Sequence, residues 1–200
     1  IEWIVLNKDG DMLFLISRYI LAPHRYHSTF TSTSWDRCDL REWLNNDFLN
    51  TAFSADEQAI IIDSYVENNG DSEDTYDKIF LLSVEEALDY FETDKERRAE
   101  PTLYALKNGV HCANNKPYGW WWLRSPGSYT SSAAYVSYDG YVCDDGIFAY
   151  YAYDAVRPAL HLDLSSSDLY SYAGTVSSDG SMNEEGGGVV TPDDPDSNQI

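Results

Sequence analysis

Short apolar runs and turn residues alternate at the start of the chain. Residues 3–6 and 12–16 are apolar runs, and the polar segment between them contains an Asp9-Gly10 step. An Asp-Gly step between two such runs favours a tight turn, so this region predicts a β-hairpin. Residues 24–35 are polar and aromatic without an apolar period, which predicts a loop.

Helical periodicity follows in the middle of the chain. Apolar residues recur at helical spacing over residues 40–48, which predicts an amphipathic helix. A serine followed three residues later by a glutamate is the capping-box pattern, and it predicts helix starts at Ser54 and Ser83. A further helix is expected over residues 101–107. Residues 78–82, which are apolar apart from Lys78, predict a short buried strand.

The periodicity changes from Trp120 onward. Short strand-like pieces alternate there with Gly, Ser and Asp turns as far as Leu162. Helices before strands indicate an α+β fold with short helices and a small, irregular antiparallel sheet. Beyond Leu164 the chain is rich in Ser, Gly, Asp and Pro, which is typical of a linker. We expect one domain over residues 1–164 and a poorly ordered acidic tail over residues 165–200, both cut from a longer multidomain protein.

The charge of the chain excludes several classes of partner. The formal net charge is −21 at pH 7, and hydrophobic residues make up 43% of the sequence. Such a chain can build a core, but it cannot neutralise the phosphates of a nucleic acid. Docking on an anionic membrane is disfavoured for the same reason, and no apolar run is long enough to span a bilayer.

Candidate chemistry is sparse. The sequence has no Gly-rich phosphate loop, no His-Glu-x-x-His pair and no Gly-x-Ser-x-Gly elbow. His24 and His27 have a weak metal-ligand spacing, and the acidic residues 68–77 offer oxygen ligands to calcium without the EF-hand spacing. We therefore expect no catalysis, no metal site and no cofactor, with calcium as an open alternative. The three cysteines allow at most one disulfide, which the sequence does not decide; they are Cys38, Cys112 and Cys143.

Residues 128–155 have an unusual composition. Tyrosines stand there among Ser, Ala, Asp and Gly, and the segment contains no Lys, Glu, Gln, Met or Trp. Antibody-type binding loops use this mixture because tyrosine gives a large amphipathic contact at low entropic cost. We predict that the segment contacts a ligand through Ser128, Tyr129, Thr130, Ser137, Tyr138, Tyr141, Cys143, Asp144, Asp145, Ile147, Tyr150, Tyr151, Tyr153 and Asp154.

The tyrosines among these contact residues are expected to be largely exposed and to gather on one face. Tyr135, which lies in an Ala-Ala-Tyr-Val piece, should instead belong to the scaffold. Among the flanking residues we expect the tryptophans 120–122 to pack mostly in the core, Arg124 and Arg157 to be paired and to tie the two flanks together, and His161 to point outward.

Several pieces of the sequence carry a family resemblance. They are WWLRSPG at residues 121–127, AAYV at 133–136 and VRPAL at 156–160, with LREWLN at 40–45 and DKIFLLS at 77–83 upstream. Together they resemble an uncharacterised bacterial domain family that is similar to the C-type-lectin-like fold of formylglycine-generating enzymes and of variable proteins of diversity-generating retroelements. In those variable proteins, template adenines are randomised, and the substituted asparagine codons never encode Lys, Glu, Gln, Met or Trp. Residues 128–155 fit that set.

The resemblance implies a function and leaves alternatives. The leading expectation is a display module on a C-type-lectin-like scaffold, on a cell surface or phage particle, that recognises a protein or a carbohydrate through residues 128–155. One alternative is an oxidase of the formylglycine-generating type on the same fold, which would need a cysteine pair or a histidine-rich metal site. A passive stalk domain of a surface protein is the other.

Overall fold

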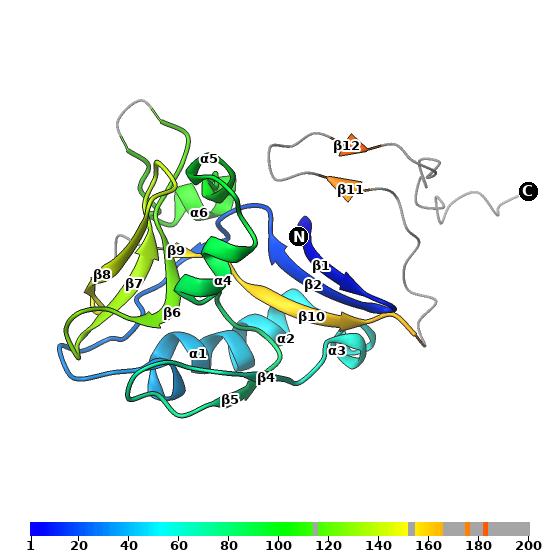
Figure 1. The fold of residues 1–200 in the computed structure, drawn as a ribbon, viewed down its shortest axis with the longest axis horizontal. Helices are drawn as coiled ribbons and strands as arrows, with labels where there is room; N and C mark the ends of the chain where they lie inside the picture. The colour runs from blue at the N-terminus through cyan, green and yellow to red at the C-terminus, as the bar shows by residue number, and fades with distance from the viewer. Residues whose placement is uncertain (114–115, 152–154, 166–174, 177–181, 184–200) are drawn as a thin grey trace, which may run out of the picture.

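Two main β-sheets and a set of short helices make up the structure, a computed structural model that describes residues 1–113, 116–151, 155–165, 175–176 and 182–183 (Figure 1). The first sheet has the order β1-β2-β10, with β1 (Trp3–Asp9), β2 (Met12–Ser17) and β10 (Ala159–Asp163), and all its pairs are antiparallel. Gly10 turns the β1–β2 hairpin with a φ of 60°, a conformation that glycine adopts without strain. The predicted hairpin is confirmed.

The second sheet has five strands in the order β3-β9-β6-β7-β8. Strands β6, β7 and β8 pair antiparallel, whereas β6 and β9 pair in parallel. The α+β class is confirmed, but this sheet is mixed rather than antiparallel. Its strands are β3 (Ala22–Pro23), β6 (Trp121–Pro126), β7 (Ser132–Val136), β8 (Val142–Phe148) and β9 (Ala155–Val156).

Two stretches of chain run through both sheets and join them. One stretch runs from β2 into β3, and the other runs from β9 into β10. The two stretches are antiparallel, because β2 pairs with β10 and β3 pairs with β9. Between the sheets, the Ser17 amide donates to the Pro158 carbonyl at 2.8 Å and the Leu21 amide donates to the Val156 carbonyl at 2.9 Å. The VRPAL piece, residues 156–160, therefore connects the two sheets.

The helices are short and belong to the middle of the chain. Both predicted capping boxes are present: Ser54 Oγ accepts from the Glu57 amide and Ser83 Oγ from the Glu86 amide, and each glutamate accepts from its serine's amide. The helices are α1 (Asp39–Trp43), α2 (Leu49–Ala52), α3 (Ala55–Ile60), α4 (Val84–Asp89), α5 (Asp94–Arg97) and α6 (Leu103–Lys107), with a 3₁₀ turn η1 (Trp35–Arg37) and a π-helical turn η2 (Leu44–Phe48) that continues α1 into α2.

The prediction of a strand over residues 78–82 is wrong. Residues 79–82 are buried and Lys78 is half-buried, but the ladder described there is an isolated bridge between Phe80 and Ala159. The strands of this region lie just before it, as the two-stranded hairpin of β4 (Ser64–Val66) and β5 (Thr75–Asp77). An apolar run of this length marks a core segment whether or not it forms a ladder.

The tryptophans form the centre of the core, as expected. Trp121, Trp122 and Leu123 are consecutive and fully buried, because other strands and helices cover both faces of β6. Trp120 is half-buried against the ring of Tyr138. A strand buried on both faces reads as a continuous apolar run rather than an alternation.

Arg124 and Arg157 are both buried and structural, but among the described residues only Arg124 has a carboxylate partner. Arg124 forms an ion pair with Glu86. Arg157 donates to the backbone carbonyls of Ser17 and Arg97, and its guanidinium lies 5.0 Å from the ring centre of Trp121. Arg157 therefore ties its flank to Trp121 on the other flank, whereas Arg124 is tied to α4.

His161 does not point outward as expected. Its ring stacks on Phe14 at 4.5 Å between centroids, and its Nδ1 lies 2.9 Å from Ser64 Oγ. Burial lowers the pKa of this imidazole. The alternation of Leu160, His161 and Leu162 misled the prediction because both faces of β10 contact other elements.

Beyond Ser165 the structure describes only β11 (Thr175–Val176) and β12 (Met182–Asn183), which pair antiparallel. The other residues of the expected tail lie outside the described part of the chain. No helix among the described residues has the length and apolar character needed to cross a membrane.

Candidate functional site

The hairpin of β7 and β8 carries most of the segment that the sequence singled out. Ser132 lies opposite Phe148 at one end of the hairpin, and Val136 lies opposite Val142 at the other. Of the proposed contact residues, Ser128, Tyr129, Thr130, Tyr141, Asp144 and Asp145 are exposed; Ser137, Tyr138, Cys143, Ile147, Tyr150 and Tyr151 are half-buried; Tyr153 and Asp154 lie outside the described residues.

The described tyrosines form two separate groups rather than the one cluster that was expected, which corrects the prediction. Tyr138 and Tyr141 lie at the turn that joins β7 to β8, whereas Tyr129, Tyr150 and Tyr151 lie at the opposite end of this hairpin. Three of these five are half-buried rather than largely exposed. Tyr135, the expected scaffold residue, is also half-buried and packs against the core.

An aromatic cluster forms at the end of the hairpin that holds Tyr129. Phe148 is its centre, with ring centroids 5.2 Å from Phe30, 5.8 Å from Tyr150, 5.7 Å from Tyr151 and 6.4 Å from Tyr129. Phe30 also meets Tyr150 edge-on at 5.4 Å. The outer rings are open to solvent, since Phe30 is 65% exposed and Tyr129 is 69% exposed.

Two members of the aromatic cluster were missed by sequence reasoning. Phe148 lies within residues 128–155 but is not a tyrosine, and Phe30 lies in a distant loop. A phenylalanine among serines and threonines, as in Ser28-Thr29-Phe30-Thr31-Ser32, is a signal for an exposed ring. Nothing local shows which strand it would meet.

Backbone contacts hold the loop over residues 24–35 against the hairpin. The His27 amide donates to the Ala149 carbonyl at 2.9 Å, and the Thr33 amide donates to the Thr130 carbonyl at 2.8 Å. These two bonds lie on either side of Phe30. They fix its position relative to the tyrosines, so the aromatic cluster is built from two segments far apart in the sequence.

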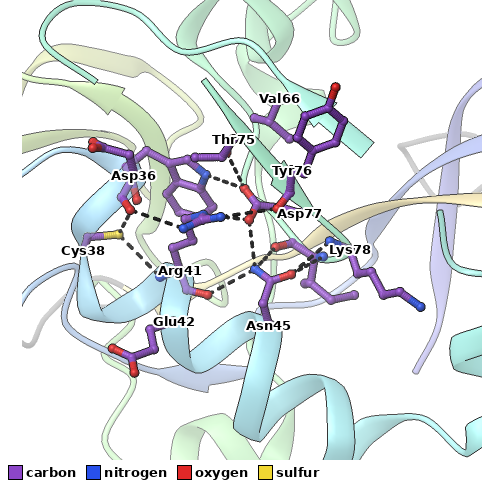
Figure 2. Close-up of polar contacts among 12 residues, drawn as sticks. Asp36, Cys38, Arg41, Glu42, Asn45, Val66, Thr75, Tyr76, Asp77 and Lys78 are labelled. Atoms are coloured by element: carbon purple, nitrogen blue, oxygen red, sulfur yellow. Dashed lines mark hydrogen bonds and ion pairs between the residues drawn. The ribbon is translucent and has the colours of Figure 1, made fainter. Parts of the chain in front are cut away.

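A buried polar network anchors the end of this loop to the scaffold (Figure 2). Asp77, at the end of β5, accepts from Trp35 Nε1 at 2.9 Å and from Arg41 Nε at 2.6 Å. The Asn45 amide group donates to the Ile79 carbonyl and its oxygen accepts from the Lys78 amide. These contacts join the LREWLN and DKIFLLS pieces, which gives both a structural role.

A groove adjoins the aromatic cluster. It has a volume of about 520 Å³, and the residues that line it include Tyr150, Tyr151, Arg25, Asn108 and His111. A hydrogen bond with Tyr151 raises the pKa of Tyr150, which keeps that phenol neutral. On β8 the carboxylates of Asp144 and Asp145 are exposed. The site thus offers rings, a groove and charges of both signs.

The candidate metal ligands and nucleophiles have other surroundings. His24 stacks on Trp43 at 4.7 Å, and Asp74 in the acidic loop bonds the Asn68 amide at 2.8 Å. Among the described residues, no three His, Cys, Asp or Glu side chains come together as metal ligands. All three cysteines are free thiols. Whether the chain catalyses a reaction stays a prediction.

Cys38 is the most buried of these thiols. It is the N-cap of α1, where its sulfur accepts from the Arg41 amide at 3.4 Å. Burial raises the pKa of this thiol to about 12. A neutral, buried thiol is a structural group and not a nucleophile.

Comparison with known proteins gives one match. The family model described as a domain of unknown function, DUF6273, matches residues 10–164. No curated protein and no solved structure matches the chain.

Proposed function

The chain belongs to the DUF6273 family, and we propose that it is a ligand-binding display module whose aromatic cluster contacts a protein ligand. The observation that carries the proposal is the exposure of Phe30 and Tyr129, at 65% and 69%. Both rings touch further rings of the aromatic cluster rather than the core. A contiguous exposed aromatic patch marks an interaction surface, and aromatic residues dominate the binding energy of protein interfaces.

The scaffold of the proposed module is a C-type-lectin-like fold. The proposal is supported by the pairing of β2 with β10, which brings the beginning and the end of the domain together. It is further supported by the small irregular sheet, in which the β7–β8 hairpin and the segments that flank it span residues 128–151. Such a hairpin tolerates changes at its ends because its centre supplies the core contacts. The proposed module acts outside the cell or on a phage particle.

Diversification by a retroelement is part of the proposal. Within residues 128–155 the fully buried positions hold small or β-branched residues such as Ala133, Ala134 and Val136. Randomising these would unfold the domain, because core substitutions cost several kcal/mol, whereas exposed positions such as Tyr129 and Thr130 tolerate change.

This pattern gives a prediction at the DNA level. We expect a reverse-transcriptase gene beside the parent gene, with a near-copy of the DNA that encodes residues 127–160. The copy should differ at codons for exposed residues and agree at those for Ala133 and Ala134. Sequencing the genomic neighbourhood tests this. The absence of a copy, or differences concentrated at the buried positions, would remove the retroelement from the proposal.

Binding is tested with the full chain on an array of purified bacterial surface proteins, followed by titration of each protein that binds. We expect Phe30→Ala and Tyr129→Ala each to weaken the affinity by about tenfold or more, because truncating an interface aromatic costs over 1 kcal/mol. Tyr141→Ala is the matched control, since this tyrosine is 59% exposed at the other end of the hairpin.

The melting temperatures of the same variants separate binding from folding. Exposed side chains contribute little to stability, so Tyr129→Ala should lower the free energy of unfolding by roughly 0.5 kcal/mol or less. A bound protein whose affinity is unchanged in Phe30→Ala and Tyr129→Ala, or an array on which no protein binds the chain, would contradict a protein-binding aromatic cluster.

A further inference from the structure

A second groove lies between the helical run of α1, η2 and α2, the stretch that joins β2 to β3, and the start of α6. This α6 groove has a volume of about 840 Å³, a size typical of small-molecule sites. None of the described residues that line it belongs to the aromatic cluster. We propose that the α6 groove binds an organic cation, meaning an ammonium group on an aromatic or aliphatic body. The lining residues that matter most are Trp43, Asp47, Phe48, Thr51 and Tyr104.

The π-helical turn η2 brings an acid and two rings of the helical run to the α6 groove. In η2 the Leu49 amide donates to the Leu44 carbonyl five residues earlier, so the turn holds more residues than a turn of α-helix. The positions four and five beyond Trp43 therefore both lie over it, and these positions are Asp47 and Phe48. All three residues line the groove. In a regular α-helix, residues five apart would not share a face, so the π-helical turn helps to build the groove.

The rings of the α6 groove are accessible to a ligand. None of the described residues that line the groove is buried, and Tyr104 on α6 is 65% exposed. Trp43 and Phe48 are half-buried, with their ring centroids 5.4 Å apart, and the ring of His24 stacks on Trp43 at 4.7 Å. These two neighbours hold the indole of Trp43 in place. The faces of aromatic rings attract ammonium groups, and tryptophan attracts them most strongly.

The charge of the α6 groove selects a cation. Among the described residues that line it there are two acids, Glu2 and Asp47, and no Lys, Arg or His. Glu2 already has a partner, because Arg18 lies 3.5 Å from its carboxylate and 5.6 Å from the ring centre of Tyr19. Asp47 is exposed, and no described residue forms a hydrogen bond or an ion pair with it. An anionic ligand would be repelled here, whereas an ammonium group would neutralise Asp47.

A second acceptor stands beside the Asp47 carboxylate. Thr51 is exposed, lines the groove and lies four residues further along the helical run. Residues four apart on a helix are neighbours, so the Thr51 hydroxyl and the Asp47 carboxylate can both accept from one ammonium group. An exposed ion pair alone contributes little to affinity. The rings of Trp43 and Tyr104 therefore have to cover the body of the ligand, which is why we assign an apolar body to the cation.

The test uses the full chain and three indole compounds that differ in the group at the end of a short side chain. Tryptamine carries an ammonium group, tryptophol a hydroxyl group and indole-3-acetate a carboxylate. Each compound is titrated at neutral pH and physiological salt by saturation-transfer difference NMR. We expect tryptamine to bind about tenfold more tightly than tryptophol, because only the cation gains from Asp47 and from the ring faces. Indole-3-acetate should bind more weakly than either.

Substitutions at exposed positions, which should leave the fold intact, separate charge from shape. Asp47→Asn should abolish the preference for tryptamine over tryptophol and leave the affinity for tryptophol unchanged. Tyr104→Ala should weaken the binding of both compounds, by about tenfold for tryptamine. Glu42→Gln is the matched control, since it removes an exposed carboxylate of the same helical run that does not line the groove, and it should preserve the preference.

The proposal is overturned if none of the three compounds binds, if tryptamine and tryptophol bind equally well, or if indole-3-acetate binds best. A preference for tryptamine that survives in Asp47→Asn, or one that disappears in Glu42→Gln, would also overturn it. The aromatic cluster lies near other exposed carboxylates, so Tyr129→Ala is the last control. Tryptamine binding that is lost in Tyr129→Ala would place the cation in the aromatic cluster and not in the α6 groove.

Discussion

Replacing Asp77 with alanine is expected to lower the free energy of unfolding by about 3–5 kcal/mol, the cost of removing one partner from a buried ion pair. The side chain of Asp77 is 0% exposed and pairs with Arg41. It also accepts from Trp35 Nε1 at 2.9 Å and from Thr75 Oγ1 at 2.7 Å. The Asn45 amide group donates to it as well, at 3.4 Å. The alanine variant removes the acceptor of all four donors, and water cannot reach the buried groups of Trp35 and Thr75.

Denaturant unfolding measures this loss, and two variants calibrate it. Asp77→Asn keeps the shape and one acceptor oxygen, so it should lose less than the alanine variant. Asp74→Ala removes a carboxylate from the same β4–β5 hairpin, where the side chain is exposed. That variant should leave the midpoint of unfolding almost unchanged. A loss of only about 1 kcal/mol for Asp77→Ala, the size of an exposed ion pair, would mean that the network does not hold the scaffold.

Stability is expected to fall steeply as the pH rises above 9. Burial raises the pKa of Cys38 to about 12 from an ordinary value of 9.0, and it raises the pKa of Tyr26 well above 10.0. Above pH 9 the unfolded chain therefore releases protons that the folded chain keeps. The contribution of Cys38 to the free energy of unfolding is fully present below pH 9 and is lost between pH 9 and pH 12. At about 1.4 kcal/mol for each pH unit, the loss is about 4 kcal/mol.

Cys38→Ser isolates this effect. A serine hydroxyl does not titrate and still accepts from the Arg41 amide as the N-cap of α1. Thermal melts between pH 8 and pH 10, below the range in which Tyr26 contributes, should show a smaller fall in melting temperature for the variant than for the unaltered chain. Equal slopes for the two proteins would show that the thiol titrates as freely in the folded chain as in the unfolded one.

Local features of the fold could be predicted from the sequence because their causes lie within a few residues. The capping boxes at Ser54 and Ser83 are hydrogen bonds between positions three apart, and the turn at Gly10 depends on the conformation of one residue. The burial of residues 79–82 and of Trp121 and Trp122 followed from their apolar character alone. Each of these needs no knowledge of the partner element.

The candidate sites depended on partners that the sequence does not specify. Composition identified residues 128–155, yet the meeting of Phe30 with Phe148 follows from how a loop and a hairpin more than a hundred residues apart pack together. His161 alternates with leucines as an outward residue would, but the β4–β5 hairpin and Phe80 cover its face. Periodicity states which residues avoid water; only the packing of distant elements decides which faces remain open to a ligand.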